Sequence, residues 1–295
     1  MTVYSEKNNI VLGITGSIAC YKAAELARRY VRDGFNVRVV FSTGAEQFIT
    51  PMTFSAITNN EVMTSFHQEN GGGIGHIEIA DWADAVVVAP ASADFIAKYA
   101  HGIADNPLLA VLLATKSPVL LAPAMNVNMW EHPATQHNVE VLRSRGVQFN
   151  EPGEGQLACG WHGRGRMAEP WDIYHYTNRV LAKPDYSGKR ILVVTGPTRE
   201  QIDPVRFISN RSSGKMGVAL AREAFRRGAE VTVIHGPVKV KLPSGVVRVP
   251  VVSAQDMHDA TLAAAFPTDG QSPDIVIMAA AVSDFRPRDP SDVKL

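Results

Sequence analysis

The sequence predicts an α/β protein made of two doubly wound, Rossmann-like parallel-sheet domains, residues 1–186 and residues 187–295. Three observations predict it. Apolar runs of strand length alternate with stretches of helical periodicity, which is typical of parallel strands covered by helices. This alternation stops in the polar, turn-rich segment KPDYSGKR at residues 183–190 and then restarts with similar motifs.

In the first domain, a strand at residues 10–14, a helix at 19–31 and a strand at 37–41 form the opening βαβ unit. Residues 85–89 and 119–122 are further short apolar runs, bounded by proline, polar or small residues. Runs of this length and setting indicate buried strands, so we expect both to extend the same parallel sheet.

The second domain reads as a loose repeat of the first, with strands expected at residues 191–195, 230–234 and 275–279. The segments RILVVTGPT, RRGAEVTVIHG and DIVIMAAAVSDF resemble NIVLGITGS, RDGFNVRVVFSTG and DAVVVAPASADF in order. Each predicts a buried strand that ends in a small-residue turn. Ligands of such sheets bind at the carboxyl ends of the strands, so we expect one crevice in each domain.

Composition excludes several classes of protein. Of the 295 residues, 45% are apolar and 20% charged, as in ordinary globular proteins, and Lys plus Arg (29) equals Asp plus Glu (29), which argues against nucleic-acid binding. Cys20 and Cys159 have neither disulfide nor metal-ligand spacing, as expected in a reducing cytoplasm. No leader peptide and no apolar run of about 18 residues is found, so we expect neither export nor a membrane span.

The first strand runs into Gly16 and Ser17, where the following helix begins. A helix N-terminus with glycine is suited to a phosphate, but neither GxGxxG nor GxxxxGK[ST] is matched, and a helix cap without ligand remains the alternative. Two more predicted strands end in small hydroxyl residues, Ser42 with Thr43, and Ser92. Convergence of three such ends favours a ligand site.

His76 follows a glycine run and precedes the apolar alternation IEIA, which predicts a strand directly after it. The glycines predict an open loop, so His76 is a catalytic candidate, with a structural histidine as the alternative. The pattern HxE occurs at residues 76–78, but PCxxC and HExxH are absent, which disfavours zinc.

The segment PAMNVNMW, residues 123–130, follows another predicted strand. Asn126 at this strand end is able to present its amide to a substrate carboxylate. The alternative is a turn and hydrophobic staple before a helix, with Met125 and Met129 filling gaps in the core.

Cys159 lies in GEGQLACGWHGRGRM, residues 153–167, among five glycines. Its neighbours His162, Arg164 and Arg166 favour a thiolate, and the glycines predict a mobile lid that carries a reactive thiol. By contrast, we expect Cys20 to be a small buried apolar residue on its helix.

In this order the motifs GSIACYK, GHIE, PAMNVNMW and ACGWHGRGRM resemble the homo-oligomeric flavin-containing cysteine decarboxylases over residues 8–182. They are most similar to the decarboxylase half of the bacterial bifunctional enzymes of coenzyme A biosynthesis. The resemblance implies FMN-dependent decarboxylation of 4'-phosphopantothenoylcysteine to 4'-phosphopantetheine, with His76 as base, Asn126 holding the carboxylate and Cys159 protonating the enethiolate. The implied FMN contacts are Gly16, Ser17, Ile18, Ser42, Thr43, Ser92, Ala93 and Met125.

Residues 195–217, TGPTREQIDPVRFISNRSSGKMG, open the second domain. Gly214 and Lys215 do not make a P-loop, because Met216 replaces the Ser or Thr that would hold magnesium. Residues 212–214 precede a predicted helix and offer either an anion-binding N-terminus or a plain cap.

This stretch resembles the phosphopantothenate–cysteine ligase half of the same bifunctional family. The resemblance implies that CTP, with Mg²⁺, activates 4'-phosphopantothenate as an acyl-cytidylate, which L-cysteine then attacks. It assigns Asn210 as the catalytic asparagine, while the metal ligands are unknown. Asp284 has a turn or cap as its alternative role. The implied CTP contacts are Met278, Ala279, Ala280, Asp284 and Lys294.

The sequence ends one residue after Lys294, where these ligases continue, so we expect a chain truncated in the ligase domain that decarboxylates without ligating. Relative to the bifunctional activity that the resemblance implies, the alternatives are a flavoprotein that only decarboxylates, one that modifies another aminoacyl thiol, and a non-catalytic flavin-binding regulator of the same fold. The resemblance also implies a homo-oligomer built from decarboxylase trimers that share flavin sites.

Overall fold

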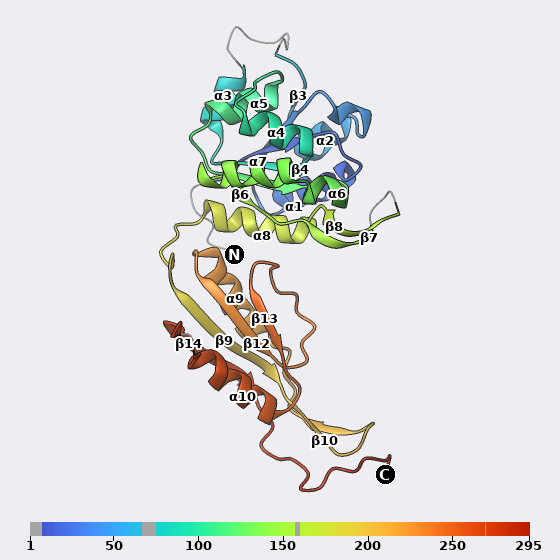
Figure 1. The fold of residues 1–295 in the computed structure, drawn as a ribbon, viewed down its shortest axis with the longest axis vertical. Helices are drawn as coiled ribbons and strands as arrows, with labels where there is room; N and C mark the ends of the chain where they lie inside the picture. The colour runs from blue at the N-terminus through green and yellow to red at the C-terminus, as the bar shows by residue number, and fades with distance from the viewer. Residues whose placement is uncertain (1–7, 67–74, 157–159, 269) are drawn as a thin grey trace. The chain divides into compact units, whose positions relative to one another are not determined.

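The computed structural model describes residues 8–66, 75–156, 160–268 and 270–295 (Figure 1). The chain separates into two compact units, residues 1–181 and 182–295. The structure divides the chain after residue 181, whereas the sequence analysis expected the boundary after residue 186. Both positions lie at or just after the end of the helix Pro170–Leu181. Each unit contains its own parallel sheet.

The sheet of the first unit has six parallel strands in the order β3-β2-β1-β4-β5-β6. Four of the five strands predicted from the sequence are confirmed, and the two-residue edge strands β3 and β6 are additional. β4 is buried along its whole length, because helices cover both faces of the sheet. The strands are β1 (Asn9–Ile14), β2 (Asn36–Phe41), β3 (Val62–Met63), β4 (Ala85–Ala91), β5 (Val119–Pro123) and β6 (Gln148–Phe149).

Alternate side chains of these strands enter two cores. Leu12, Val87 and Leu120 pack with the helices α1, α2 and α8, whereas the adjacent residues Val11 and Val86 pack with α3, α4, α5 and α7. α6 leads directly into α7. The helices are α1 (Cys20–Arg32), α2 (Pro51–Thr58), α3 (Gly75–Trp82), α4 (Ala93–Ala100), α5 (Pro107–Ala114), α6 (Val127–Glu131), α7 (Pro133–Ser144) and α8 (Pro170–Leu181), with one 3-10 turn at Ala45–Gln47.

The prediction of a strand directly after His76 is wrong, because residues 75–82 form helix α3. Ile77 is exposed, while Ala80 and Ala83 are buried and Ile79 is partly buried against the same core. This is helical spacing rather than alternation, and α3 packs along α5.

An antiparallel hairpin, β7 (Gly153–Gln156) with β8 (His162–Arg166), follows β6. Its connection includes Cys159, which lies outside the described residues. β8 docks on the chain between β5 and α6, where the Met125 N–H donates to the Gly165 carbonyl at 3.0 Å. A Cβ at Gly165 would lie 2.4 Å from the Met125 carbonyl oxygen, so this contact requires glycine.

The second unit has a four-stranded parallel sheet in the order β13-β12-β9-β14. The three predicted strands are confirmed, and β14 is not covered on both faces, since Met278 is 62% exposed and Ile275 and Val276 are exposed as well. Among the described strands β14 pairs only with β9, so it lies at the edge. The elements are β9 (Arg190–Pro197), β10 (Arg199–Gln201), β11 (Phe207–Ser209), α9 (Lys215–Arg226), β12 (Glu230–His235), β13 (Val247–Pro250), α10 (Ala254–Ala265) and β14 (Ile275–Ala281).

No helix in the described part of the chain combines the length and the apolar character needed to cross a bilayer.

Candidate functional site

The carboxyl ends of β1, β2 and β4 meet at one edge of the first sheet. The Thr15 hydroxyl donates to the Pro90 carbonyl at 2.8 Å and accepts from the Ser92 N–H at 2.9 Å, which ties the end of β1 to the end of β4. The loops after β1 and β2 approach closely, since a Cβ at Gly16 would lie 3.0 Å from the Gly44 carbonyl oxygen. The convergence of strand ends expected from the sequence is therefore observed.

These loops enclose a hollow of about 420 Å³, called the Ser92 hollow below. Ser92 also caps α4, because its hydroxyl accepts from the Phe95 N–H at 3.3 Å. Thr43 is exposed beside the hollow, and Ile18 lies in the neighbouring one. Six of the predicted flavin contacts line this hollow: Gly16, Ser17, Ser42, Ser92, Ala93 and Met125. The six other described lining residues are Gly44, Gln47, Phe48, Asp94, Ala124 and Met129.

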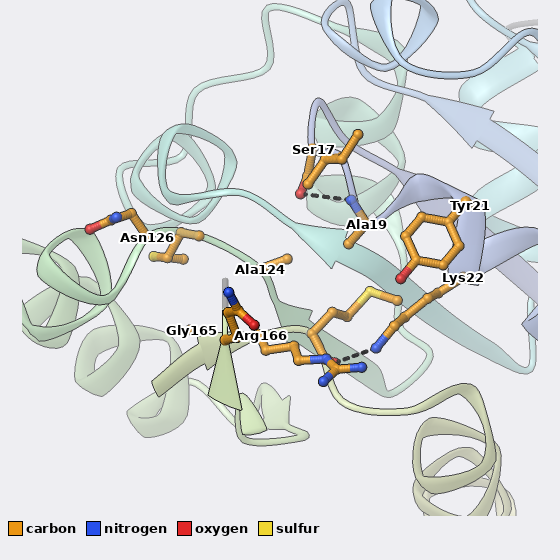
Figure 2. Close-up of a pocket in the computed structure, with 12 residues that line it drawn as sticks. Ser17, Ala19, Tyr21, Lys22, Ala124, Asn126, Gly165 and Arg166 are labelled. Carbon is orange, nitrogen blue, oxygen red and sulfur yellow. Dashed lines mark hydrogen bonds between the residues drawn. The ribbon is translucent and has the colours of Figure 1, made fainter. Parts of the chain in front are cut away.

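A second hollow, of about 590 Å³, adjoins the first and is called the Asn126 hollow (Figure 2). The two share Ser17, Ala124 and Met125 in their linings, so together they form one continuous surface around Met125. The remaining lining residues of the Asn126 hollow are Ile18, Ala19, Tyr21, Lys22, Asn126, Gln156, Gly165, Arg166 and Met167.

Asn126 is the N-cap of α6, and its Oδ1 accepts from the Asn128 N–H at 2.8 Å. This bond constrains the orientation of the side chain, and Asn126 lines the hollow. The segment does lead into a helix, and Met125 packs against the core, whereas Met129 is half exposed, so the alternative that the methionines fill gaps in the core is wrong for Met129 only.

Lys22 is a charged residue on the buried side of α1, only 6% exposed. Its Nζ donates to Glu169 Oε1 at 2.9 Å and to the Met167 carbonyl at 3.3 Å. Arg166 Nη2 lies 3.2 Å from the same Oε1 atom. The sequence analysis assigned no role to Lys22 or Glu169. Lys22 stands among apolar residues of an amphipathic helix, and this position was the signal that could have indicated a buried, paired lysine.

His76 and Cys159 are not placed with Asn126 in the described part of this chain. His76 lines neither hollow, and its ring stacks edge-on against Phe66 with centroids 5.6 Å apart. α3, which carries His76, packs on the face of the sheet opposite α1 and α8. Cys159 lies outside the described residues, in the connection between β7 and β8.

Cys20 is confirmed as a buried apolar position. Its Sγ donates to the Thr15 carbonyl at 3.2 Å, and burial raises the pKa of its thiol above the usual range, against the opposing effect of nearby backbone hydrogen bonds. Cys20 is therefore held as a neutral thiol at neutral pH.

In the second unit, Asn210 lies at the carboxyl end of β14. Its Nδ2 donates to the Val282 carbonyl at 2.8 Å, and the Ser283 N–H donates to the Thr198 hydroxyl at 2.9 Å. The first bond joins the segment after β11 to the segment after β14, and the second joins the link between β9 and β10 to that same segment. Of the predicted CTP contacts, Met278, Ala279 and Ala280 lie in β14 and Asp284 follows it.

Lys294 is near the turn of the β10–β11 hairpin, because the N–H of its neighbour Leu295 donates to Asp203 Oδ2 at 3.2 Å. Burial would raise the pKa of Asp203, but hydrogen bonds from Arg206 and from backbone N–H groups outweigh it and hold the pKa well below the usual range. The Asp203 carboxylate thus organises this corner in its ionised form.

Glycines bring the loops after β9 and β12 together beside the start of α9. Gly214, with φ of 68°, precedes α9 and accepts from the Thr195 hydroxyl at 3.2 Å. A Cβ at Gly236 would lie 1.6 Å from the Pro197 carbonyl oxygen. Within the described ranges, no group of three or more His, Cys, Asp or Glu side chains is arranged to hold a metal ion.

Comparison with known protein families gives a match for each unit. Residues 2–182 match the family described as Flavoprotein. Residues 186–295 match the family described as DNA/pantothenate metabolism flavoprotein C-terminal domain.

Among curated proteins, the chain is similar to the Coenzyme A biosynthesis bifunctional protein CoaBC of Bacillus subtilis (strain 168), with 46% identity over 292 residues, 97% of this chain and 71% of that protein. It is 44% identical to the CoaBC protein of Escherichia coli (strain K12) over 279 residues, 94% of this chain and 68% of that protein.

Among solved structures, the chain is similar to a PPC decarboxylase mutant complexed with pantothenoylaminoethenethiol, with a TM-score of 0.54 and 31% identity over 58% of this chain and 97% of that one. It is also similar to the FMN binding protein AtHal3, with a TM-score of 0.52 and 31% identity over 58% of this chain and 95% of that one. Both similarities, like the α/β architecture with parallel sheets, agree with the predicted fold class.

Proposed function

This chain belongs to the family of coenzyme A biosynthesis bifunctional proteins, and from that premise we propose two reactions for it. It is an enzyme with a flavoprotein decarboxylase domain and a ligase-type domain. We propose that the second domain joins 4'-phosphopantothenate to L-cysteine with CTP, and that the first converts the resulting 4'-phosphopantothenoylcysteine to 4'-phosphopantetheine. The observation that carries the proposal is the pair of adjoining hollows around Met125.

The Ser92 hollow fits FMN on chemical grounds. Its lining combines small residues, which leave room for a flat ring, with the hydroxyls of Ser17, Ser42 and Ser92 and the N-terminus of α4, which suit a phosphate. Pockets of about 300–1,000 Å³ are usual for cofactors, and this hollow adjoins a second one that shares three of its lining residues. FMN bound there would supply two-electron oxidation of the substrate thiol and return the electrons to the product.

Oxidation of the thiol is needed because a carboxylate on a saturated carbon leaves its electron pair without an acceptor when carbon dioxide departs. A thioaldehyde beside that carbon accepts the pair. In this scheme the Asn126 Nδ2 donates to the substrate carboxylate and orients it, which its fixed capping geometry supports. His76 accepts the proton of the thiol, and Cys159 protonates the enethiolate.

His76 reaches this site most simply from a second copy of the chain. Within one chain it lines neither hollow and lies on the other face of the sheet from α1. We therefore propose a homo-oligomer, built on decarboxylase trimers, in which His76 of one copy completes the Asn126 hollow of another.

For ligation, we propose that CTP and Mg²⁺ bind at the carboxyl end of β14. The bond from Asn210 to the Val282 carbonyl supports this, since it brings the proposed catalytic amide beside the proposed nucleotide segment. There the Asn210 amide is placed to stabilise charge on an activated acyl group. Lys294 and Asp284 are proposed as further CTP contacts.

Two assays on one preparation test the proposal. Anaerobic addition of 4'-phosphopantothenoylcysteine should bleach the yellow flavin absorbance and release carbon dioxide, and CTP with 4'-phosphopantothenate and L-cysteine should release CMP. Flavin that does not bleach would reject the decarboxylase and favour a flavin-binding regulator. A second candidate function is decarboxylation without ligation. It is favoured by the exposure of β14, the strand that carries proposed CTP contacts. Bleaching of the flavin without release of CMP would establish it.

A further inference from the structure

The wall of the Asn126 hollow formed by α1 and β8 is positively charged. Among the described residues that line the hollow, Lys22 and Arg166 are cationic and no carboxylate is present. Both cations contact the same atom, Glu169 Oε1, at 2.9 Å and 3.2 Å. One carboxylate therefore faces two cations, and this wall has an excess of one positive charge.

The positions of these cations are fixed by the fold. Lys22 is almost fully buried and is held by Glu169 and the Met167 carbonyl. Arg166 follows Gly165, whose close contact with Met125 sets the position of β8. The Arg166 side chain is 48% exposed, so its guanidinium stays accessible to a ligand.

Figure 2 shows the Arg166 guanidinium next to the Lys22 ammonium, and Asn126 well apart from this pair. The hollow thus has two polar ends, an amide at one and a cationic pair at the other. An extended ligand with an anionic group at each end matches this arrangement.

We propose that Arg166, held by Glu169 and adjoining Lys22, binds the phosphate of the decarboxylase substrate and sets its preference for phosphorylated over unphosphorylated substrates. The inference rests on the proposed function, because that function supplies a substrate with a carboxylate and a phosphate. Asn126 is proposed to take the carboxylate. A guanidinium binds a phosphate monoester through paired charge-assisted hydrogen bonds, which leaves Arg166 as the phosphate ligand.

The test compares two substrates in three proteins loaded with FMN. The substrates are phosphopantothenoylcysteine with and without its 4'-phosphate, and the proteins are the parent chain, Arg166→Gln and Arg143→Gln. Arg143 is a matched control, since it is 50% exposed, pairs with Glu151 and lines neither hollow. Kinetics are measured together with dissociation constants of 4'-phosphopantetheine and pantetheine by calorimetry.

Arg166→Gln should lower kcat/KM for the phosphorylated substrate by about 10- to 100-fold, mainly through KM, the usual effect of losing a charged hydrogen bond. The unphosphorylated substrate should change by less than about twofold, because it has no phosphate to lose. The 4'-phosphopantetheine dissociation constant should rise in parallel. Arg143→Gln should leave both substrates unchanged.

An equal loss for both substrates would overturn the inference, since it would mean that Arg166 acts on the carboxylate, on Cys159 or on folding. An unchanged preference would overturn it as well. If Arg166→Gln does not fold or load FMN, Arg166→Lys takes its place, because it keeps the charge but not the paired donors. Arg166→Lys should lose part of the preference for the phosphorylated substrate. If it keeps the full preference, the inference is contradicted. A parent chain that decarboxylates neither substrate would instead reject the proposed function.

Discussion

At the scale of single residues, the two cysteines have different chemical settings. Cys20 is enclosed in the first core and hydrogen-bonded to the Thr15 carbonyl, and its burial raises the pKa of the thiol. Thiolate chemistry at neutral pH is therefore disfavoured at Cys20. The proposed proton donor is Cys159, in the connection of the β7–β8 hairpin.

Replacing Cys159 with serine should stop the decarboxylase late, after carbon dioxide has left. A serine hydroxyl is a much weaker acid than a thiol, so the enethiolate is no longer protonated. Mass spectrometry of anaerobic and aerobic reactions should show an oxidised, decarboxylated species and at least about 100-fold less 4'-phosphopantetheine. Cys20→Ala is the control and should still form product, and parent-level product from Cys159→Ser would exclude the proposed role.

Replacing His76 with asparagine should abolish flavin reduction while FMN remains bound. His76 lines neither hollow within the described chain, so its loss should leave the flavin contacts of that chain intact. Stopped-flow absorbance under anaerobic conditions should show bleaching slowed by about 100-fold or more, as expected for loss of a general base. Bleaching at the parental rate would show that His76 is only a structural partner of Phe66.

At the scale of elements, the β7–β8 hairpin depends on close backbone contact with the segment before α6. The carbonyl of Gly165 accepts from the Met125 N–H, and no Cβ fits at Gly165. This contact connects the strand that carries Arg166 to Asn126. Both proposed substrate contacts therefore depend on one glycine.

Gly165→Ala should weaken hairpin docking and lower stability by about 1–3 kcal/mol, the usual cost of overpacking. Decarboxylase activity should fall more than stability, because the hairpin carries proposed site residues. Thermal denaturation and the decarboxylase assay measure the two effects. Gly102→Ala is the control: its φ is also positive, at 71°, but its Cβ would meet no atom within 4 Å, so equal effects of the two variants would exclude the contact as the cause.

At the scale of the whole molecule, the two units differ in how completely their sheets are covered. β4 in the first unit is buried throughout, and β9 in the second is nearly so. β14 has no fully buried position and is exposed at Ile275, Val276 and Met278, although it pairs along its whole length with β9. Exposed edge strands are the parts of a sheet that open most readily.

Hydrogen exchange should therefore begin in the second unit. We expect the amides of residues 275–281 to exchange faster than those of β4 by on the order of 100-fold, because local opening of an exposed edge requires little loss of packing. Mass spectrometry of peptides from the FMN-loaded protein measures both segments in one sample, so β4 is the internal control. Equal protection of β14 and β4 would show that another surface covers β14.

The sequence by itself determined the strands β1, β2, β4, β5, β9, β12 and β14, because apolar runs and small-residue turns are local signals. It also placed Gly16, Ser42, Ser92 and Asn126 just after strand ends. It missed the short edge strands β3, β6 and β13 and mistook α3 for a strand, since these depend on neighbours distant in the chain.

Only the tertiary structure decided which residues share a surface. It joined Lys22 to Glu169 across 147 positions of sequence and left His76 outside both hollows. It also showed which residues of β14 are exposed, namely Ile275, Val276 and Met278. The physical reason is that burial and ion pairing depend on packing between distant segments, and no local window of sequence contains that information.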